Sequence, residues 1–338
     1  MKEVLKGIIA ATLISSGAGS ANAQDLEQVK IGYYPGTMLS ALVLVAEGKG
    51  FYRDAGIEPT LISTASGPIA NSNIASGAID IALQPPSNIG VARDQGLDQV
   101  IIAGNLYMPW VVMARSSVDT PHLGAYPDIM GDLKGLTWGP YARGSDSELF
   151  LRVMASDAGL DLDNDITWVG VGGPATGLPA LQSGQIQVYL ALDPAPIVAS
   201  SQGYGKTVVD LRKGQGPEDF SDTVYQAMVT KRTTAQERPE MIRKIVAAHE
   251  KTFCWINEEE NFAEFLSFMQ TKLPVGNLDD VQYEGMVRDG MTLLTMGFPA
   301  SSIEVWNKML LKADAIKTPL VTDDLFWETV SDTDPSCD

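Results

Sequence analysis

Two stretches of the chain repeat one pattern, IASGAIDIALQP at Ile74–Pro85 and LQSGQIQVYLALDP at Leu181–Pro194. In each, Ser-Gly is followed by one residue, an isoleucine, alternating apolar residues and a proline. Such a Gly is typical of a helix end, and the alternation is typical of a strand. Each strand would deliver a polar residue, Gln84 or Asp193, at its carboxyl end. The repeat predicts two similar α/β lobes, although a match this short can also arise by chance.

Strand and helix patterns alternate around both stretches. Short connections separate them, which is typical of parallel sheets covered by helices on both faces. From Pro239 onward the chain is mainly helical, and Pro239 suits a first helical turn. We therefore expect an α/β fold. The predicted strands are Gln28–Tyr33, Glu58–Ser63, Ile79–Leu83, Val100–Ala103, Gly135–Gly139, Ile166–Val171, Ile186–Leu192 and Thr207–Leu211.

Length and charge narrow the class of protein. The chain has 338 residues, which suits two lobes rather than one compact unit. Lys and Arg number 24 against 42 Asp and Glu, so the net charge is −18. Such a field repels phosphate backbones and argues against nucleic-acid binding. Two His and two Cys cannot build the usual closed zinc site, although Asp and Glu could still hold a hard cation. We expect neither a metal site nor a cofactor.

The first 23 residues fit a secretory signal peptide. Lys2 and Lys6 flank a short start, Gly7–Ile14 is apolar, and Ala21-Asn22-Ala23 fits a cleavage site. The apolar run is far below the ~20 residues that a bilayer-spanning helix needs. We therefore expect residues 1–23 to direct export and to be removed.

Export makes a disulfide possible, because exported proteins fold in oxidising compartments. Cys254 lies in a predicted helix, and Cys337 is the penultimate residue. A bond between them would clip the C-terminal tail to the body of the protein. Two unpaired thiols fit the sequence almost as well, since sequence does not give the Cα separation that a disulfide requires.

Loops rich in Gly, Pro and Ser follow the predicted strands and open helices. Helix N-termini present unpaired N–H groups and the positive end of a dipole, so several of them together favour an anion-binding cleft. Arg143 adds a guanidinium suited to carboxylate, sulfonate or phosphate groups. Taken singly, each loop also fits plain helix capping, with Arg143 as a solvated charge. The candidate ligand-binding residues are Tyr33, Tyr34, Thr37, Gly67, Pro68, Gln84, Ser87, Asn105, Trp110, Tyr141, Arg143, Ser145, Ser147, Gly173, Ala175, Thr176 and Asp193.

Aromatic residues occur near the same loops and could stack on a flat ligand. Tyr34 and Tyr141 lie in turns and are the stronger candidates, whereas Trp110 and Trp138 fit a strand core equally well.

Two apparent nucleotide motifs are incomplete. Gly205-Lys206-Thr207 resembles the end of a phosphate loop, but Ser200 stands where its first Gly is required. The stretch 170–175 fits GxGxxA after a strand, but Pro174 interrupts the turn. Neither His122 nor His249 has an evident nucleophile partner, so no catalytic triad is indicated.

Ile31–Ala92 resembles the nitrate, sulfonate and taurine group of ABC-transporter substrate-binding proteins, which also includes thiamine-precursor binders. The phrase GKGFYRDAGIEP at Gly48–Pro59 and SGAIDIAL before Pro-Pro are typical of that group. Leu133–Leu151 and Leu178–Pro194 extend the similarity into the second half.

The resemblance implies a two-lobed periplasmic-binding fold of type II, in which each lobe is a mainly parallel sheet flanked by helices. Signal peptide 1–23 would precede lobe 1, comprising 24–114 and 227–338, and lobe 2, comprising 115–226. Two hinge crossings are expected near Met113–Ser116 and Tyr225–Met228. Ligand binding would close the hinge.

The resemblance further implies a periplasmic protein, expected as a monomer, that docks on a membrane permease driven by an ATPase and catalyses no reaction. Helix N-termini, Arg143 and the aromatics favour a small organic anion, either a sulfonate or an aromatic carboxylate. A pyrimidine thiamine precursor is an alternative, with Asp193 accepting from its amine. A cofactor-biosynthesis enzyme of the same fold is another.

Overall fold

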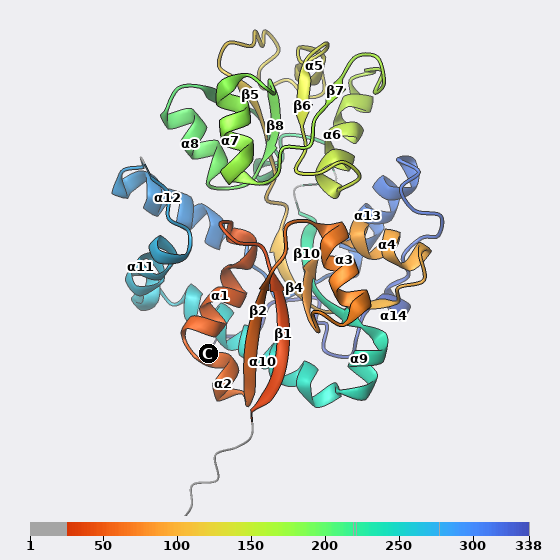
Figure 1. Cartoon of the computed structure of the whole chain (residues 1–338), viewed down its shortest axis with the longest axis vertical. Coiled ribbons are helices and arrows are strands. Elements are labelled where there is room, and N and C mark those ends of the chain that lie inside the picture. Colours follow the sequence, from red (N-terminus) through yellow and green to blue (C-terminus); the bar gives the residue numbers. More distant parts are fainter. Residues whose placement is uncertain (1–25, 219, 221, 277, 338) are drawn as a thin grey trace, which may run out of the picture.

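The computed structural model describes residues 26–218, 220, 222–276 and 278–337. The predicted signal peptide, residues 1–23, lies outside this range. Figure 1 shows two α/β lobes, with β5 to β8 and α5 to α8 forming the upper one.

The first lobe is built on strands in the order β2-β1-β3-β10-β4. The strands β1 and β2 are parallel, and a parallel bridge between Ile31 and Ile81 joins β1 to the start of β3. Strand β10 lies antiparallel between β3 and β4. The strand bounds are β1 Glu27–Tyr33, β2 Ile57–Ser63, β3 Ala82–Gln84, β4 Gln99–Tyr107 and β10 Val224–Lys231.

The second lobe repeats this arrangement, in the order β7-β6-β8-β5-β9. Here β5 is the antiparallel strand, between β8 and β9. The strand bounds are β5 Val111–Arg115, β6 Thr137–Gly139, β7 Thr167–Trp168, β8 Val188–Ala191 and β9 Gly205–Asp210. The expectation of two similar, mainly parallel lobes is therefore confirmed.

The repeated sequence pattern occupies the same place in each lobe. In the first lobe α3 leads into β3, and in the second α7 leads into β8. Gly77 and Gly184 end these helices with φ of 73° and 83°, a left-handed conformation that glycine adopts without strain. Both helices also carry a proline in the first turn, Pro68 or Pro174.

Helices cover the sheets, and most of them belong to the first lobe. The first-lobe helices are α1 Ala41–Gly48, α2 Phe51–Asp54, α3 Gly67–Ser76, α4 Pro86–Asp94, α9 Arg232–Glu237, α10 Pro239–Asn257, α11 Phe262–Lys272, α12 Asp280–Met291, α13 Ala300–Lys312 and α14 Thr322–Leu325. The second-lobe helices are α5 Asp128–Gly131, α6 Asp146–Asp157, α7 Pro174–Ser183 and α8 Ala195–Ser201. No helix within the described residues is both long and apolar enough to cross a membrane.

The chain crosses between the lobes at positions that differ from the expected ones. The chain passes from the first-lobe sheet to the second-lobe sheet between Tyr107 and Val111, and it returns between Lys213 and Val224. The expected crossing at Met113–Ser116 falls largely inside β5, and that at Tyr225–Met228 falls inside β10. Neither β5 nor β10 was among the predicted strands, so both lobe boundaries were placed several residues too late.

Apolar packing continues from one lobe into the other beside α6. Phe150 of α6 lies against Trp306 of α13, with ring centroids 5.6 Å apart. Phe150 also contacts Tyr225 of β10 at 6.1 Å. All three side chains belong to one buried cluster that draws on both sheets. This shared core holds the two lobes together on one side of the gap between them.

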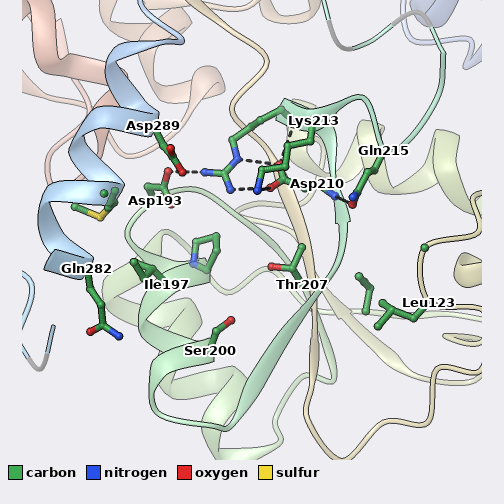
Figure 2. A pocket seen from close by; sticks show the side chains of 16 residues that line it. Leu123, Asp193, Ile197, Ser200, Thr207, Asp210, Lys213, Gln215, Gln282 and Asp289 are labelled. Carbon is green, nitrogen blue, oxygen red and sulfur yellow. Dashed lines mark hydrogen bonds and ion pairs between the residues drawn. The ribbon is translucent and has the colours of Figure 1, made fainter. Parts of the chain in front are cut away.

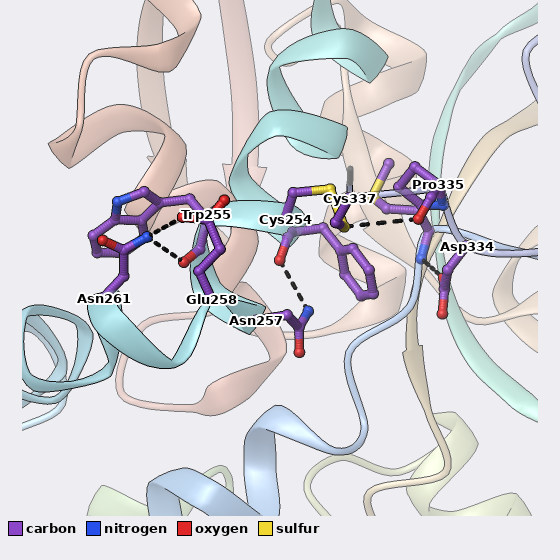
Figure 3. Close-up of a disulfide and its surroundings, with 10 residues drawn as sticks. Cys254, Trp255, Asn257, Glu258, Asn261, Asp334, Pro335 and Cys337 are labelled. Carbon is purple, nitrogen blue, oxygen red and sulfur yellow. Dashed lines mark hydrogen bonds between the residues drawn. A yellow bond between two sulfur atoms is a disulfide. The ribbon is translucent and has the colours of Figure 1, made fainter.

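Cys254 and Cys337 form a disulfide, with Cα atoms 5.2 Å apart, so the pairing is confirmed (Figure 3). The bond ties the end of the chain to α10. Nearby, Asp334 Oδ1 accepts hydrogen bonds from Met296 N at 2.6 Å and Gly297 N at 3.0 Å. The C-terminal segment is thereby fixed along the first lobe.

Candidate functional site

A cavity of about 370 Å³ lies between the lobes. Its walls come from loops that follow β1, β2 and β3 in the first lobe and β6, β7 and β8 in the second. The lining residues are Tyr34, Pro35, Gly36, Thr37, Leu39, Ser63, Thr64, Ala65, Ser66, Gly67, Pro85, Asn88, Trp110, Tyr141, Ser145, Asp146, Gly172, Gly173, Pro174, Ala175, Thr176, Leu192 and Tyr225. Parallel strands end at one edge of a sheet, so these loops meet where open α/β sheets bind ligands.

Three helices of ten or more residues begin at the cavity, namely α3, α6 and α7. Their N-cap residues, Ser66, Ser145 and Gly173, make no side-chain capping hydrogen bond. The first-turn amides of α3 and α7 are therefore not satisfied by their own caps, whereas in α6 the carboxyl of Asp146 accepts from the amides of Asp146 and Ser147. Among the described lining residues there is no Lys, Arg or His. Positive potential in the cavity therefore comes from backbone amides and helix dipoles.

Aromatic rings form one wall of the cavity. Trp110 meets Tyr141 edge-on at a centroid distance of 5.1 Å and meets Tyr225 edge-on at 5.8 Å. Behind them, Tyr189 stacks on Tyr141 at 5.8 Å and 15°. The buried Trp110 Nε1 and Tyr141 Oη have no hydrogen-bond partner in the part of the chain that the structure describes. Polar atoms of Tyr189 and Leu192 lie near the Tyr141 hydroxyl, and the Tyr225 hydroxyl lies near Trp110 Nε1, but none forms a hydrogen bond of regular geometry. Both donors thus lie at a wall suited to a flat or apolar body.

Among the described lining residues, Asp146 alone carries a carboxyl group. It is 9% exposed and accepts a hydrogen bond of 2.5 Å from the hydroxyl of Tyr225. Burial raises the pKa of Asp146 above its usual value, and the hydrogen bond from Tyr225 opposes that shift. Burial and the proximity of Asp146 also raise the pKa of Tyr34, so this phenol stays protonated. Asp146 is an acceptor for any ligand that carries an N–H or O–H group.

The structure brings nine of the predicted residues together at the cavity. They are Tyr34, Thr37, Gly67, Trp110, Tyr141, Ser145, Gly173, Ala175 and Thr176. Trp110 and Trp138, for which a core position fitted equally well, differ: both are buried, but only Trp110 lines the cavity.

Eight predicted residues do not line the cavity. Some support its wall from behind, as Gln84 does by accepting a 3.0 Å hydrogen bond from Asn88 Nδ2. Ser147 accepts from Tyr141 N at 2.9 Å, and Asn105 donates to Leu39 O at 3.0 Å. Tyr33 and Pro68 lie beside the lining loops, and Ser87 faces a neighbouring space.

Arg143 points away from the cavity. Its Nε donates to Glu148 Oε2 at 2.9 Å, and its guanidinium lies over the ring of Trp168 at 5.9 Å. The side chain is 54% exposed. Glu148, five residues further along in α6, therefore pairs with the charge that was expected to face a ligand.

Asp193 lies in a different hollow, of about 540 Å³, beside α12 (Figure 2). Arg212 donates to Asp193 Oδ2 at 2.7 Å and holds Asp210 through two bonds of 2.8 Å. Burial raises the pKa of Asp193 to about 6, although Arg212 opposes the shift. Because its carboxyl is engaged with Arg212, Asp193 is not the acceptor expected for a ligand amine.

Several lining residues were missed by sequence reasoning. Asp146 stood inside a loop already noted for its Ser and Gly residues, so its position gave a usable signal. Tyr225 enters from β10, which begins after the chain crosses back from the second lobe, and no local pattern marks it. Among the described residues, no cluster of three or more His, Cys, Asp or Glu is suited to hold a metal.

Comparison with known proteins defines the class first. The alkanesulfonate-binding protein of Xanthomonas axonopodis pv. citri, solved with MOPS, is similar at a TM-score of 0.71 and 16% identity, over 90% of this chain and 99% of that one. A Candida albicans protein described as having the generic periplasmic binding protein fold matches at a TM-score of 0.69 and 12% identity, over 93% of this chain and 100% of that one. The chain has the periplasmic binding protein fold.

The sequence then gives the family. The model of the NMT1-like family matches residues 22–270, and the chain belongs to that family. A Brucella abortus (strain 2308) protein, whose name gives it only as a binding protein, is 22% identical over 251 residues. That match covers 72% of this chain and 73% of the relative.

Proposed function

We propose that the protein is an extracytoplasmic solute-binding protein of an ABC importer, which captures a small organic anion between its lobes. The observation that carries this proposal is the cavity of about 370 Å³, because α3, α6 and α7 all begin at its wall. A site of this size suits a small molecule. The role is capture and release, without a chemical reaction.

A sulfonate or an aromatic carboxylate is the proposed ligand. Its acidic group would accept hydrogen bonds from the first-turn amides near Gly67, Ser145 and Ala175, which replace the missing basic side chains. Its body would pack on Trp110 and Tyr141, whose free N–H and O–H donors add specificity. The similarity in fold to a sulfonate-binding protein supports the same ligand class.

A pyrimidine thiamine precursor is a second candidate, and Asp146 is the observation that favours it. Its carboxyl is buried in the cavity wall beside two tyrosines, where it could accept from an exocyclic amine. The aromatic wall suits a pyrimidine ring as well as an aromatic acid. If the ligand is a pyrimidine, Asp146 would accept the hydrogen bond from its amine, which the sequence analysis assigned to Asp193.

Transport would follow from closure of the lobes. A ligand that touches loops of both lobes stabilises the closed form, which would dock on a membrane permease served by an ATPase. We propose that the protein acts as a monomer in the periplasm. Small-angle scattering with saturating ligand should show a smaller radius of gyration than without it. Superimposable curves would contradict closure.

A thermal-shift screen of sulfonates, aromatic carboxylates, nitrate and pyrimidines tests the proposal, because a ligand that binds the native state raises its melting point. Asp146→Asn separates the two candidates. The variant should bind an organic anion at least as tightly as the natural protein does, but should bind an aminopyrimidine more weakly. A screen in which no compound class raises the melting point would contradict both candidates, and chemical conversion of a bound compound would point to an enzyme.

A further inference from the structure

A second chamber, of about 270 Å³, adjoins the ligand cavity. It lies between α4, α6 and the C-terminal end of α13. Asn88, Ser145 and Asp146 line both spaces, so the cavity and the chamber share one wall. Asn88 belongs to the first lobe and Ser145 to the second, so this wall forms where the two lobes meet.

Ser87 supplies an unused donor in this chamber. It is 3% exposed, and its Oγ is buried without a hydrogen-bond partner among the described residues. Ser87 is the second residue of α4, after Pro86, which has no N–H group. Its amide is therefore the first that this nine-residue helix offers. A hydroxyl and a helix N-terminus thus meet at one point of the wall.

Arg152 of α6 brings a positive charge to the same chamber. Its guanidinium lies 5.8 Å from the ring of Trp168. Its hydrogen bond to Glu148, from Nη1 to Oε1, is long at 3.5 Å. Glu148 is held more closely by Arg143 Nε at 2.9 Å and Gly144 N at 2.8 Å. Most donors of Arg152 are therefore left for another acceptor. Arg143 and Arg152 together offset the charge of Glu148, so this carboxylate does not exclude an anion.

The rest of the chamber wall is apolar. Val91, Leu149, Leu310 and Ala315 contribute aliphatic surface from α4, α6 and the end of α13. Such a surface suits a short hydrocarbon or aromatic stem that carries a terminal acceptor toward Ser87 and Arg152.

We propose that the bound solute spans both spaces and is a bifunctional organic anion: one acidic group lies in the cavity, and a second acceptor group, such as a carboxylate, binds Ser87 and Arg152 in the chamber. This inference rests on the proposed function, because it specifies the ligand of the same site. It adds that the solute is elongated and has polar groups at both ends.

Calorimetry with matched probes tests the inference. One pair is benzenesulfonate and 4-sulfobenzoate, and the other is butanesulfonate and 4-sulfobutanoate. In the first pair the second compound carries a carboxylate in place of a ring hydrogen, and in the second pair it carries one in place of the terminal methyl group. The unaltered protein should bind the bifunctional member about tenfold more tightly, as expected for hydrogen bonds to a charged group.

Two variants test whether the tighter binding of the bifunctional compound arises in the chamber. Val91→Trp, on the exposed side of α4, should fill the chamber and bring the ratio of the two affinities close to one. Ser87→Ala should reduce the same ratio. Val281→Trp is the matched control, because Val281 is 82% exposed on α12 and lines neither space, so the ratio should be kept.

Equal binding of both members of each pair by the unaltered protein would overturn this inference alone, as would an unchanged ratio in Val91→Trp. Absence of binding by all four sulfonates would overturn the proposed sulfonate class and this inference with it.

Discussion

Replacing Tyr141 by Phe should remove one hydrogen-bond donor from the cavity and leave the packing of the ring in place. Its hydroxyl has no partner among the described residues, while its ring packs on Trp110 and Tyr189. Tyr141→Phe keeps the ring and should weaken an organic anion by about 1.5–3 kcal/mol, the scale of a hydrogen bond to a charged group. Titration calorimetry measures the change. Arg143→Ala is the control and should alter affinity for an anion with a single acidic group, such as benzenesulfonate, less than about twofold, because Arg143 is paired with Glu148 outside the cavity. The reverse ranking would contradict this site.

The same two residues show what sequence can predict at this scale. Both were recognised from their place in a helix-opening turn, yet only Tyr141 reaches the cavity. The direction of Arg143 is set by Glu148, and that of Asp193 by Arg212, which returns to it from the end of β9. A turn motif identifies a position near a site, whereas the direction of a long charged side chain depends on its partners.

His249 should make the protein sensitive to acid. It is fully buried, its Nε2 shares a hydrogen bond with Tyr52 Oη, and burial lowers its pKa from 6.5 to about 3. Between these values the unfolded chain binds a proton that the folded chain does not, so the free energy of unfolding falls as pH falls. The slope is at most about 1.4 kcal/mol per pH unit. Urea unfolding between about pH 7 and about pH 4 should show that the free energy of unfolding falls less with pH in His249→Gln than in the natural protein. Parallel curves would contradict the assignment.

Among the elements, the contact between α3 and α4 requires glycine at position 67. A Cβ there would lie 1.8 Å from Asn88 Nδ2 and 2.4 Å from its Cγ. Gly67→Ala should therefore push the Asn88 amide away from Gln84 and destabilise the protein by about 1–3 kcal/mol. Denaturant unfolding measures this. In an Asn88→Ala background the same substitution should cost clearly less. Equal costs in both backgrounds would show that the contact between the two residues is not the cause.

The elements were the most predictable level of the fold. The Ser-Gly and isoleucine pattern located β3 and β8 correctly, because glycine in a left-handed helix end and apolar alternation are local properties. The crossings were misplaced because β4 and β5 are separated by only three residues and are both apolar. Local pattern reveals a strand, while its sheet is decided by partners far along the chain.

For the whole molecule, the disulfide closes a long loop. Cys254 and Cys337 are 83 residues apart, and the bond restricts the unfolded chain over that span. Replacing both by Ser should lower the free energy of unfolding by about 2–4 kcal/mol. Urea unfolding of the variant against the oxidised protein checks this. Two free thiols in the denatured natural protein would contradict the bond.

The central claim is that a solute binds between the lobes, where α3, α6 and α7 begin. Ala175 is exposed at the start of α7 and lines the cavity, so Ala175→Trp would fill it with a ring. Calorimetry with the best organic anion from the screen should give one site per chain for the natural protein and at least about a hundredfold weaker binding for Ala175→Trp. Ala263→Trp, exposed on α11, should bind normally. Equal affinity in all three proteins would show that the ligand binds elsewhere.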